Sequence, residues 1–265
     1  MTLIDFHQKT DDADKPGMTA LDGRIRPVKA ARAFLKLMRN KEDSAQVVHF
    51  RTALDGDWHM PMARRFEAHP EGKKILDRGD WLFDTVTNTS YLASLPQGSL
   101  GRTYYETTHL KGFTPQGFRD QDAKGQDFTL LPPKAEFVNY RLIDMHDLLH
   151  TVTGYGRDGM GEICILEFQG IQFKSRGLRM LSYAAVTEVW KKYPDTPALK
   201  CVREANRIAK EATWMAVVDW ESLLPRPIDE VREMLNMAPP EGYLAIHDLW
   251  QERDREMKEE LAAAA

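Results

Sequence analysis

Apolar residues recur at helical spacing along most of this chain, and the alternation typical of strands is scarce. In the segment 27–39 they follow at intervals of three, four and three, as Val28, Ala31, Leu35 and Met38. A basic stripe occupies the other side of the same segment, formed by Lys29, Arg32, Lys36 and Arg39. This pattern predicts an amphipathic helix whose basic side faces solvent. We therefore expect a mainly α fold, a helical bundle in a single domain over residues 24–261.

Breaks in the pattern divide the chain into further segments. Helices are predicted over 62–76, 81–93, 100–111 and 204–221, and a final amphipathic helix extends from Tyr243 to Leu261. Residues 1–23 are acidic and rich in turn-forming residues, so they are expected to be a flexible arm. Residues 112–134 contain several glycines and prolines and are expected to form an exposed loop or lid.

Charge and cysteine content exclude several classes of protein. The chain has 36 Lys+Arg and 40 Asp+Glu, a net charge of −4, whereas a nucleic-acid-binding protein needs a basic face. Its two cysteines, Cys164 and Cys201, rule out a disulfide framework and a cysteine-based zinc cluster. No apolar run approaches the roughly 18 residues of a membrane span. Because the first residues are acidic and unlike a presequence, we expect a protein on the cytosolic side.

One short segment has the composition of a metal site. His146 and His150 are four residues apart, which on a helix places them about 40° apart and one turn along the axis. Asp147 lies about 60° from His150 on the other flank of that stripe, so three ligands are predicted to converge from one helix. Glu162 follows His150 after eleven intervening residues and completes the set. Two imidazoles with carboxylates suit zinc or iron(II).

The stretch between the histidines and Glu162 contains four glycines in residues 154–161. Glycines permit a tight reversal, so we expect two antiparallel helices joined by a glycine-rich turn, with the metal between them. Two histidines alone would more often be ordinary core or surface residues; the added acidic residues and the turn favour a metal. The order of residues in His146-Asp147-x-x-His150 differs from that of the metalloprotease HExxH helix, in which a glutamate follows the first histidine and acts as general base. It also differs from the HD phosphohydrolases, which need further, distant ligands.

The spacing His146-Asp147-x-x-His150-x11-Glu162 resembles the signature of the ubiquinone (coenzyme Q) biosynthesis protein four family. Supporting similarities flank it on both sides: Tyr140-Arg141, Leu95-Pro96-x-Gly98-Ser99-Leu100-Gly101, Trp220-Glu221-x-Leu223-Leu224 and Glu230-Val231-Arg232-x-x-Leu235-Asn236. The similarity extends from about Val28 to Asn236. No counterpart is identified for residues 1–23, for 112–134 or for the tail after Pro239.

The resemblance implies an all-α protein of ubiquinone synthesis that binds one divalent metal ion, zinc or iron(II), with cobalt as a third candidate. By this resemblance the metal ligands are His146, Asp147, His150 and Glu162, and catalysis proceeds through them. Tyr140 and Arg141 would be lesser candidates for contact with the site or with the substrate carboxylate. The implied reaction is oxidative decarboxylation of a polyprenylated hydroxybenzoate precursor, in which the ring C1 carboxylate is replaced by hydroxyl.

Two other functions remain open at this point. The family is also described as a non-catalytic scaffold that binds prenyl lipid and organises the ubiquinone biosynthetic complex, with a structural metal. A hydrolase that uses metal-bound water is a third alternative. The expected partners are the polyprenylated quinone precursor, other ubiquinone biosynthesis proteins, a membrane surface and a second copy of the chain in a homodimer. Because the resemblance implies a role at a membrane and the first residues are unlike a presequence, we expect a cytoplasmic protein peripherally associated with the bacterial inner membrane rather than the mitochondrial one.

Overall fold

Helices make up most of the protein. The computed structural model describes residues 24–39, 45–123, 127–250, 252, 253, 255 and 259. The first half contains α1 (Pro27–Arg39), α2 (Ala45–Asp55), α3 (His59–Ala68), α4 (Pro70–Arg78), α5 (Leu82–Val86), α6 (Thr89–Ser94), α7 (Leu100–Thr107), η2 (His109–Lys111), α8 (Pro115–Ala123), η3 (Phe128–Leu130) and α9 (Pro133–Asp144). The second half contains α10 (His146–Thr153), α11 (Gly159–Gln172), α12 (Arg176–Lys192), α13 (Ala198–Glu211), η4 (Met215–Val217), α14 (Trp220–Leu223), α15 (Ile228–Met234) and α16 (Glu241–Leu244).

The predicted mainly α class is confirmed. Among the described residues there is no strand, and the β-type pairing is one isolated bridge between Ser99 and Pro227. The predicted arm at 1–23 lies outside those residues. The predicted C-terminal helix is interrupted by a turn at residues 245–246 after α16, and the described residues beyond it, 247–250, 252, 253, 255 and 259, are helical.

Several predicted helices are interrupted at places where the local sequence opposes continuation. The segment 62–76 is divided between α3 and α4 because His69 is extended (ψ 133°) before Pro70, and a residue before proline disfavours the helical conformation. The segment 204–221 ends early, since Ala212 is extended and α13 stops at Glu211. These breaks produce more and shorter helices than the periodicity predicts.

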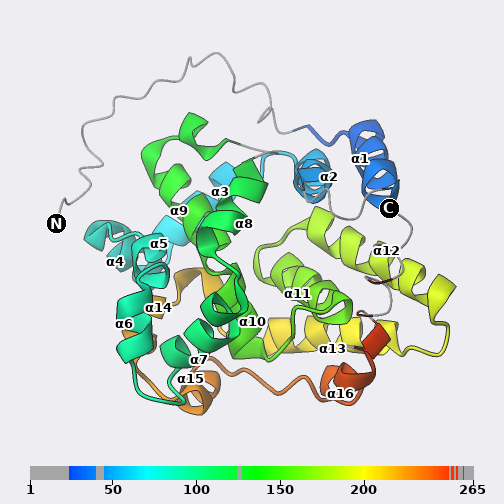
Figure 1. Cartoon of the computed structure of the whole chain (residues 1–265). Helices are drawn as coiled ribbons and strands as arrows, with labels where there is room; N and C mark the ends of the chain where they lie inside the picture. Colours follow the sequence, from blue (N-terminus) through cyan, green and yellow to red (C-terminus); the bar gives the residue numbers. More distant parts are fainter. Residues whose placement is uncertain are drawn as a thin grey trace.

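Figure 1 shows how the helices are arranged around α10. On one side α11 packs against both α12 and α13; on the other, α7 and α15 contact α10. Helix α9 leads directly into α10 and packs on α3, α5 and α8. A single large hydrophobic core connects these elements, with fully buried residues such as Leu148, Leu149, Phe168 and Trp220.

A second, smaller core joins α1, α2 and α12, and it corrects the predicted face of the first helix. The buried residues of α1 are Ala30, Ala33 and Leu37, which pack with Phe50, Ala53 and Leu181. Val28 and Leu35, which belong to the predicted apolar stripe, are 65% and 57% exposed. The small alanine side chains allow α1 to approach α2 closely, so this narrower stripe is buried instead.

The segment 112–134 is only partly the exposed loop that was predicted. It contains α8 and the short turn η3, and Phe128 is buried in the main core. Part of this segment therefore packs on the protein, directly beside the start of α10.

Candidate metal centre

Helix α10 places two histidines side by side in the interior. Met145 alone separates it from α9, and all 8 of its residues are buried. His146 and His150 share one helix face because they are four residues apart, and their ring centroids are 4.9 Å apart. The helix ends where Gly154 adopts a left-handed conformation (φ 81°), which glycine accepts without steric cost.

The next helix brings a carboxylate to the same place. The Asp158 side chain caps α11 by accepting hydrogen bonds from the backbone N–H groups of Met160 and Gly161, each at 3.0 Å. Glycine is required at position 161, because a Cβ there would lie 2.0 Å from the Gly156 carbonyl oxygen. This tight entry puts Glu162 in the first turn of α11, opposite the histidines.

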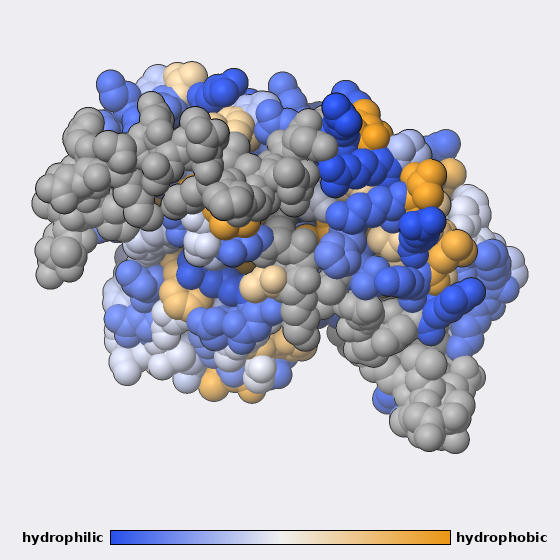
Figure 2. Space-filling view, turned by 90° about the horizontal axis from the view of Figure 1, so that it is seen from above, coloured by the Kyte–Doolittle hydropathy of each residue, from blue (hydrophilic) through white to orange (hydrophobic). Residues whose placement is uncertain are grey.

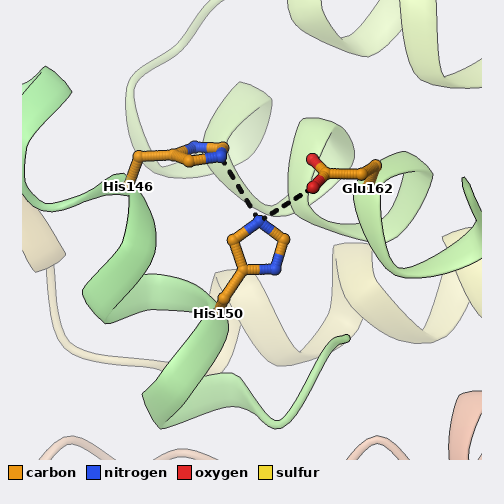
Figure 3. Close-up of side chains that lie close together, drawn as sticks. All are labelled: His146, His150 and Glu162. Atoms are coloured by element: carbon orange, nitrogen blue, oxygen red, sulfur yellow. Dashed lines mark hydrogen bonds and ion pairs between the residues drawn. The ribbon is translucent and has the colours of Figure 1, made fainter. Parts of the chain in front are cut away.

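The three side chains converge on a common point (Figure 3). Nε2 of His150 lies 3.3 Å from Nε2 of His146 and 3.4 Å from Oε1 of Glu162. One ligand atom from each residue lies within 4.8 Å of the other two. Two ligands bound at 2.0–2.1 Å to a tetrahedral ion are roughly 3.3–3.4 Å apart. The donor set and its spacing therefore fit one divalent cation, with a position left for a further ligand.

Burial and mutual charge determine the protonation of these groups. Burial is the main cause that lowers the pKa of His146 to about 4. Burial also opposes the charged form of His150, but the Glu162 carboxylate outweighs it, and the pKa of His150 is raised. Partial burial likewise opposes charge on Glu162, whose side chain is 42% exposed, but the two histidines lower its pKa to about 2. Because a ligating imidazole is neutral, a cation at this point competes with a proton on His150.

Asp147 does not point at the other three groups. It is one residue past His146, about 100° further around the helix, and its carboxylate pairs with Arg157 at 2.8 Å. The Arg157 guanidinium also donates to Thr108 and lies 4.5 Å from the ring centre of Phe113. Sequence reasoning did not single out Arg157, although its position in the glycine-rich segment was a signal that it lies near the histidines.

Helix α8 covers the beginning of α10. The ring of Phe118 stacks on that of His146, with centroids 4.2 Å apart and planes inclined by 8°. The neighbouring Arg119 forms two hydrogen bonds, of 2.6 and 2.7 Å, with the buried carboxylate of Asp144. Neither residue was predicted to belong to the site, because no spacing within the chain relates α8 to α10.

Tyr140 and Arg141, the two lesser candidates, lie apart from the triad. Arg141 is 1% exposed, and its guanidinium donates to both carboxylate oxygens of Glu221 and to the carbonyl of Val218. Tyr140 packs edge-on against Trp81 in an aromatic group. The structure brings together His146, His150 and Glu162, and it places these other two residues in the supporting core.

Comparison with known proteins gives the following relatives. The profile of the family described as "Coenzyme Q (ubiquinone) biosynthesis protein Coq4" matches residues 27–241. The ubiquinone biosynthesis protein coq4, mitochondrial, of Penicillium rubens is 26% identical over 192 residues, which cover 72% of this chain and 64% of the fungal protein. The ubiquinone biosynthesis protein coq-4, mitochondrial, of Neurospora crassa is 25% identical over 194 residues, which cover 72% of this chain and 53% of the Neurospora protein. The chain thus spans less than two thirds of these relatives.

These names correct the predicted location. The fungal relatives are named as mitochondrial proteins, so their names point to mitochondria, and the prediction of a cytoplasmic protein at the bacterial inner membrane is wrong. That prediction relied on the acidic residues of 1–23, which lie outside the described part of the chain. Among the residues that are described, no helix combines the length and apolar character needed to cross a bilayer.

A solved structure shares the fold. The crystal structure of a protein from Nostoc punctiforme, described there as a ubiquinone biosynthesis protein, superposes with a TM-score of 0.59 at 18% identity. The match covers 80% of this chain and 98% of the Nostoc chain. Given the profile match over most of its length, this chain belongs to the coenzyme Q (ubiquinone) biosynthesis protein Coq4 family.

Proposed function

We propose that this protein acts in ubiquinone biosynthesis as a metal-dependent enzyme, with His146, His150 and Glu162 as the metal ligands. The observation that supports this most directly is the spacing of the three ligand atoms, 3.3 and 3.4 Å, from two different helices. The side chain of Glu162 is 42% exposed, so the triad is open on that side to a substrate. Asp147 contributes by holding Arg157 beside the triad rather than as a ligand.

The proposed substrate is a polyprenylated hydroxybenzoate. Ring C1 loses its bond to the carboxylate carbon, which leaves as CO₂, and gains a bond to a hydroxyl oxygen. This change removes two electrons from the ring, so it requires an oxidant such as dioxygen. Bound zinc would supply Lewis acidity, whereas iron(II) or cobalt would add the redox chemistry that zinc lacks.

The residues around the triad suit an anionic aromatic substrate. The guanidinium of Arg157, which Asp147 and Thr108 hold in place, provides a positive charge next to the ligands, and this charge favours an anionic substrate there. Phe113, which stacks on that guanidinium, is 45% exposed, and Leu110 in the preceding turn is 63% exposed. These two residues offer apolar surface to a polyprenyl tail. Arg141 is unsuited to hold the substrate carboxylate, because Glu221 already occupies its guanidinium.

We also propose that α1 rests on an anionic membrane surface, where a polyprenyl substrate resides. Val28 and Leu35 project from the same side of α1 as Arg32 and Arg39, all within about 60° of one another, so these two arginines do not lie on the opposite side from the apolar residues as the pattern predicted. Figure 2 shows apolar and hydrophilic residues interleaved on the right of this face, the part of the molecule that α1 and α12 build. Mixed basic and apolar helices bind the interface of anionic bilayers.

The test is Glu162→Gln in a strain that lacks its native family member. We expect the carboxylated precursor to accumulate while protein level and the assembly of other pathway proteins stay unchanged, because one ligand is lost without loss of the fold. Glu233→Gln, an exposed residue of α15, is the matched control. Loss of assembly together with all intermediates would instead favour the scaffold function. Purified protein that holds no zinc, iron or cobalt after reconstitution would refute the metal-dependent enzyme.

A further inference from the structure

A cavity of about 540 Å³ lies beside the C-terminal end of α11. Its walls come mainly from the connection between α2 and α3, the first two turns of α3 and the turn between α11 and α12. Phe173 in this wall follows Glu162 by eleven residues, about 16 Å along the helix axis, so the cavity is separate from the candidate metal centre. Its volume is typical of sites that bind small molecules.

Three buried side chains give the cavity an apolar wall. Trp58, Met62 and Phe173 line it and are 9%, 4% and 3% exposed. Trp58 and Met62 are four residues apart at the start of α3, so their side chains lie on the same side. Nε1 of Trp58 donates to the carbonyl oxygen of Phe173 at 2.6 Å, which fixes the indole against the end of α11. This wall therefore offers an aromatic surface to the body of a ligand.

Three cationic side chains line the same cavity, and no described residue supplies any of them with a carboxylate partner. They are Arg65, Lys174 and Arg176. Of the two aspartates in the wall, Asp55 already accepts hydrogen bonds from the Ser175 hydroxyl and the Gly177 N–H, at 2.5 and 2.8 Å. Asp57 is exposed and balances one cation. The wall therefore carries more positive than negative charge.

Arg65 differs from other partly or fully buried arginines of this protein. Arg119, Arg141 and Arg157 each pair with a carboxylate. The guanidinium of Arg65 instead stacks on Trp214, 3.7 Å from the ring centre, and its buried Nη1 has no hydrogen-bond partner among the described residues. Burial lowers the pKa of Arg65, which no carboxylate raises again. Because an unpaired buried donor is unfavourable, an anion in the cavity would supply a missing interaction.

We infer that this cavity is a second binding site, for a small amphipathic monoanion of the aromatic carboxylate class. The carboxylate binds at Arg65 and Lys174, and the ring lies on Trp58 and Phe173. Lys174 has a φ of 55°, a conformation that glycine adopts more readily, so the chain places a positive charge here at a conformational cost. The inference does not depend on the triad or on the proposed reaction.

Calorimetric titration with 2-naphthoate tests the site, and uncharged 2-naphthamide is the matched ligand. We expect naphthoate to bind at one site and the amide to bind at least about tenfold more weakly, because the charge-assisted hydrogen bonds are lost. Arg65→Met should weaken naphthoate by a similar factor. Lys174→Gly should weaken it about threefold to tenfold without loss of stability, since glycine accepts the positive φ. Binding lost only because a variant unfolds is thereby distinguished from loss of a ligand contact.

Arg64→Met is the control variant. Arg64 is the neighbouring residue of α3, but it is exposed and does not line the cavity, so naphthoate affinity should stay within about twofold. Equal weakening by Arg64→Met and Arg65→Met would overturn the site. So would equal affinity for the acid and the amide, or no saturable binding of naphthoate up to about 1 mM.

Glu162→Gln distinguishes this cavity from the triad, where Arg157 also attracts anions. We expect the affinity for naphthoate to be the same in Glu162→Gln as in the unaltered protein, with or without Zn²⁺. A changed affinity in this variant, or displacement of naphthoate by Zn²⁺, would place the anion at the triad and overturn the second site. Failure of the unaltered protein to bind Zn²⁺ would overturn the proposed metal centre alone, and naphthoate binding that depends on Arg65 would still support the cavity.

Discussion

Helices α10 and α1 use polar and apolar residues in opposite ways. Every residue of α10 is buried, including two histidines, an aspartate and two threonines. In α1 the buried residues are Ala30, Ala33 and Leu37, while the larger Val28 and Leu35 are exposed. The polar groups of α10 are tolerated inside because each has a partner, such as Arg157 for Asp147. Burial in this protein therefore follows the available partners and space as much as residue type.

The comparison predicts where substitutions are costly, and we expect the largest effect at Arg141 in α9, the helix that leads into α10. Its 1% exposed guanidinium is bound to Glu221, itself largely buried. Removing one partner of a buried pair leaves an uncompensated charge and costs about 3–5 kcal/mol. Arg141→Ala should lower the free energy of unfolding in urea by that amount, with metal affinity of the folded protein unchanged.

The control for this measurement is Arg207→Ala. Arg207 pairs with Glu211 on α13, but both side chains are about half exposed, so the loss should stay within about 0.5 kcal/mol. Normal stability of Arg141→Ala combined with loss of substrate binding would show that Arg141 has the role first expected of it, at the substrate carboxylate.

The triad could be predicted from the spacing of its residues along the chain. The residues that reach it through packing between helices could not. The interval of four residues and the glycines before Glu162 led to the three side chains that meet in the structure. Asp147 was misplaced because sequence spacing does not show that Arg157 attracts its carboxylate away. Gln169 and Phe118 were missed since their contacts with His146 depend on how α11 and α8 pack.

The features of the fold that could not be predicted also depend on contacts between helices. Helical class was evident from periodicity, but α1 has two candidate stripes, and periodicity alone does not choose between them. The stripe with two alanines is buried because α2 approaches closely, which is a property of the packed pair. The helix within 112–134 was also missed, because glycines and prolines at its edges resemble those of a loop, while contacts such as Arg119 with Asp144 stabilise it.

Acid should destabilise the region around α10 and α9, where histidines are buried. We expect this loss of stability to be somewhat smaller than that caused by Arg141→Ala. His59, 3% exposed and hydrogen-bonded to Asn139 of α9, has a pKa lowered to about 4 by burial and then by the charge of Arg51. The unfolded chain binds this proton below about pH 6.5, so the stability that neutral His59 contributes is lost as the pH falls from about 6.5 to about 4. The full loss is about 3 kcal/mol.

Urea unfolding of metal-free protein between pH 7 and pH 4 measures this loss. His59→Gln should show a shallower dependence on pH, because the group that takes up the proton is gone. Helix α1 contains no histidine, so the protection factors of its amides, which are corrected for the intrinsic effect of pH on exchange, should change only when the whole protein unfolds. An identical pH dependence in both proteins would assign the loss to other groups, among them His146.

The smallest effect on stability, and the sharpest contrast with α10, is expected at the exposed stripe of α1. Leu35→Ser should change the free energy of unfolding by no more than about 0.5 kcal/mol, since this leucine is 57% exposed. Binding to vesicles of phosphatidylcholine with anionic phosphatidylserine should nevertheless fall several-fold, because an apolar side chain no longer enters the interface.

Arg32→Gln should weaken vesicle binding about fivefold at low salt, because each basic residue contributes about 1 kcal/mol at an anionic surface, and it should weaken binding less at high salt. Leu244→Ser, at a leucine 51% exposed on α16, is the matched control and should bind as the unaltered protein does. Equal binding by all of these proteins would mean that α1 does not meet the membrane, and its exposed valine and leucine would then need another partner.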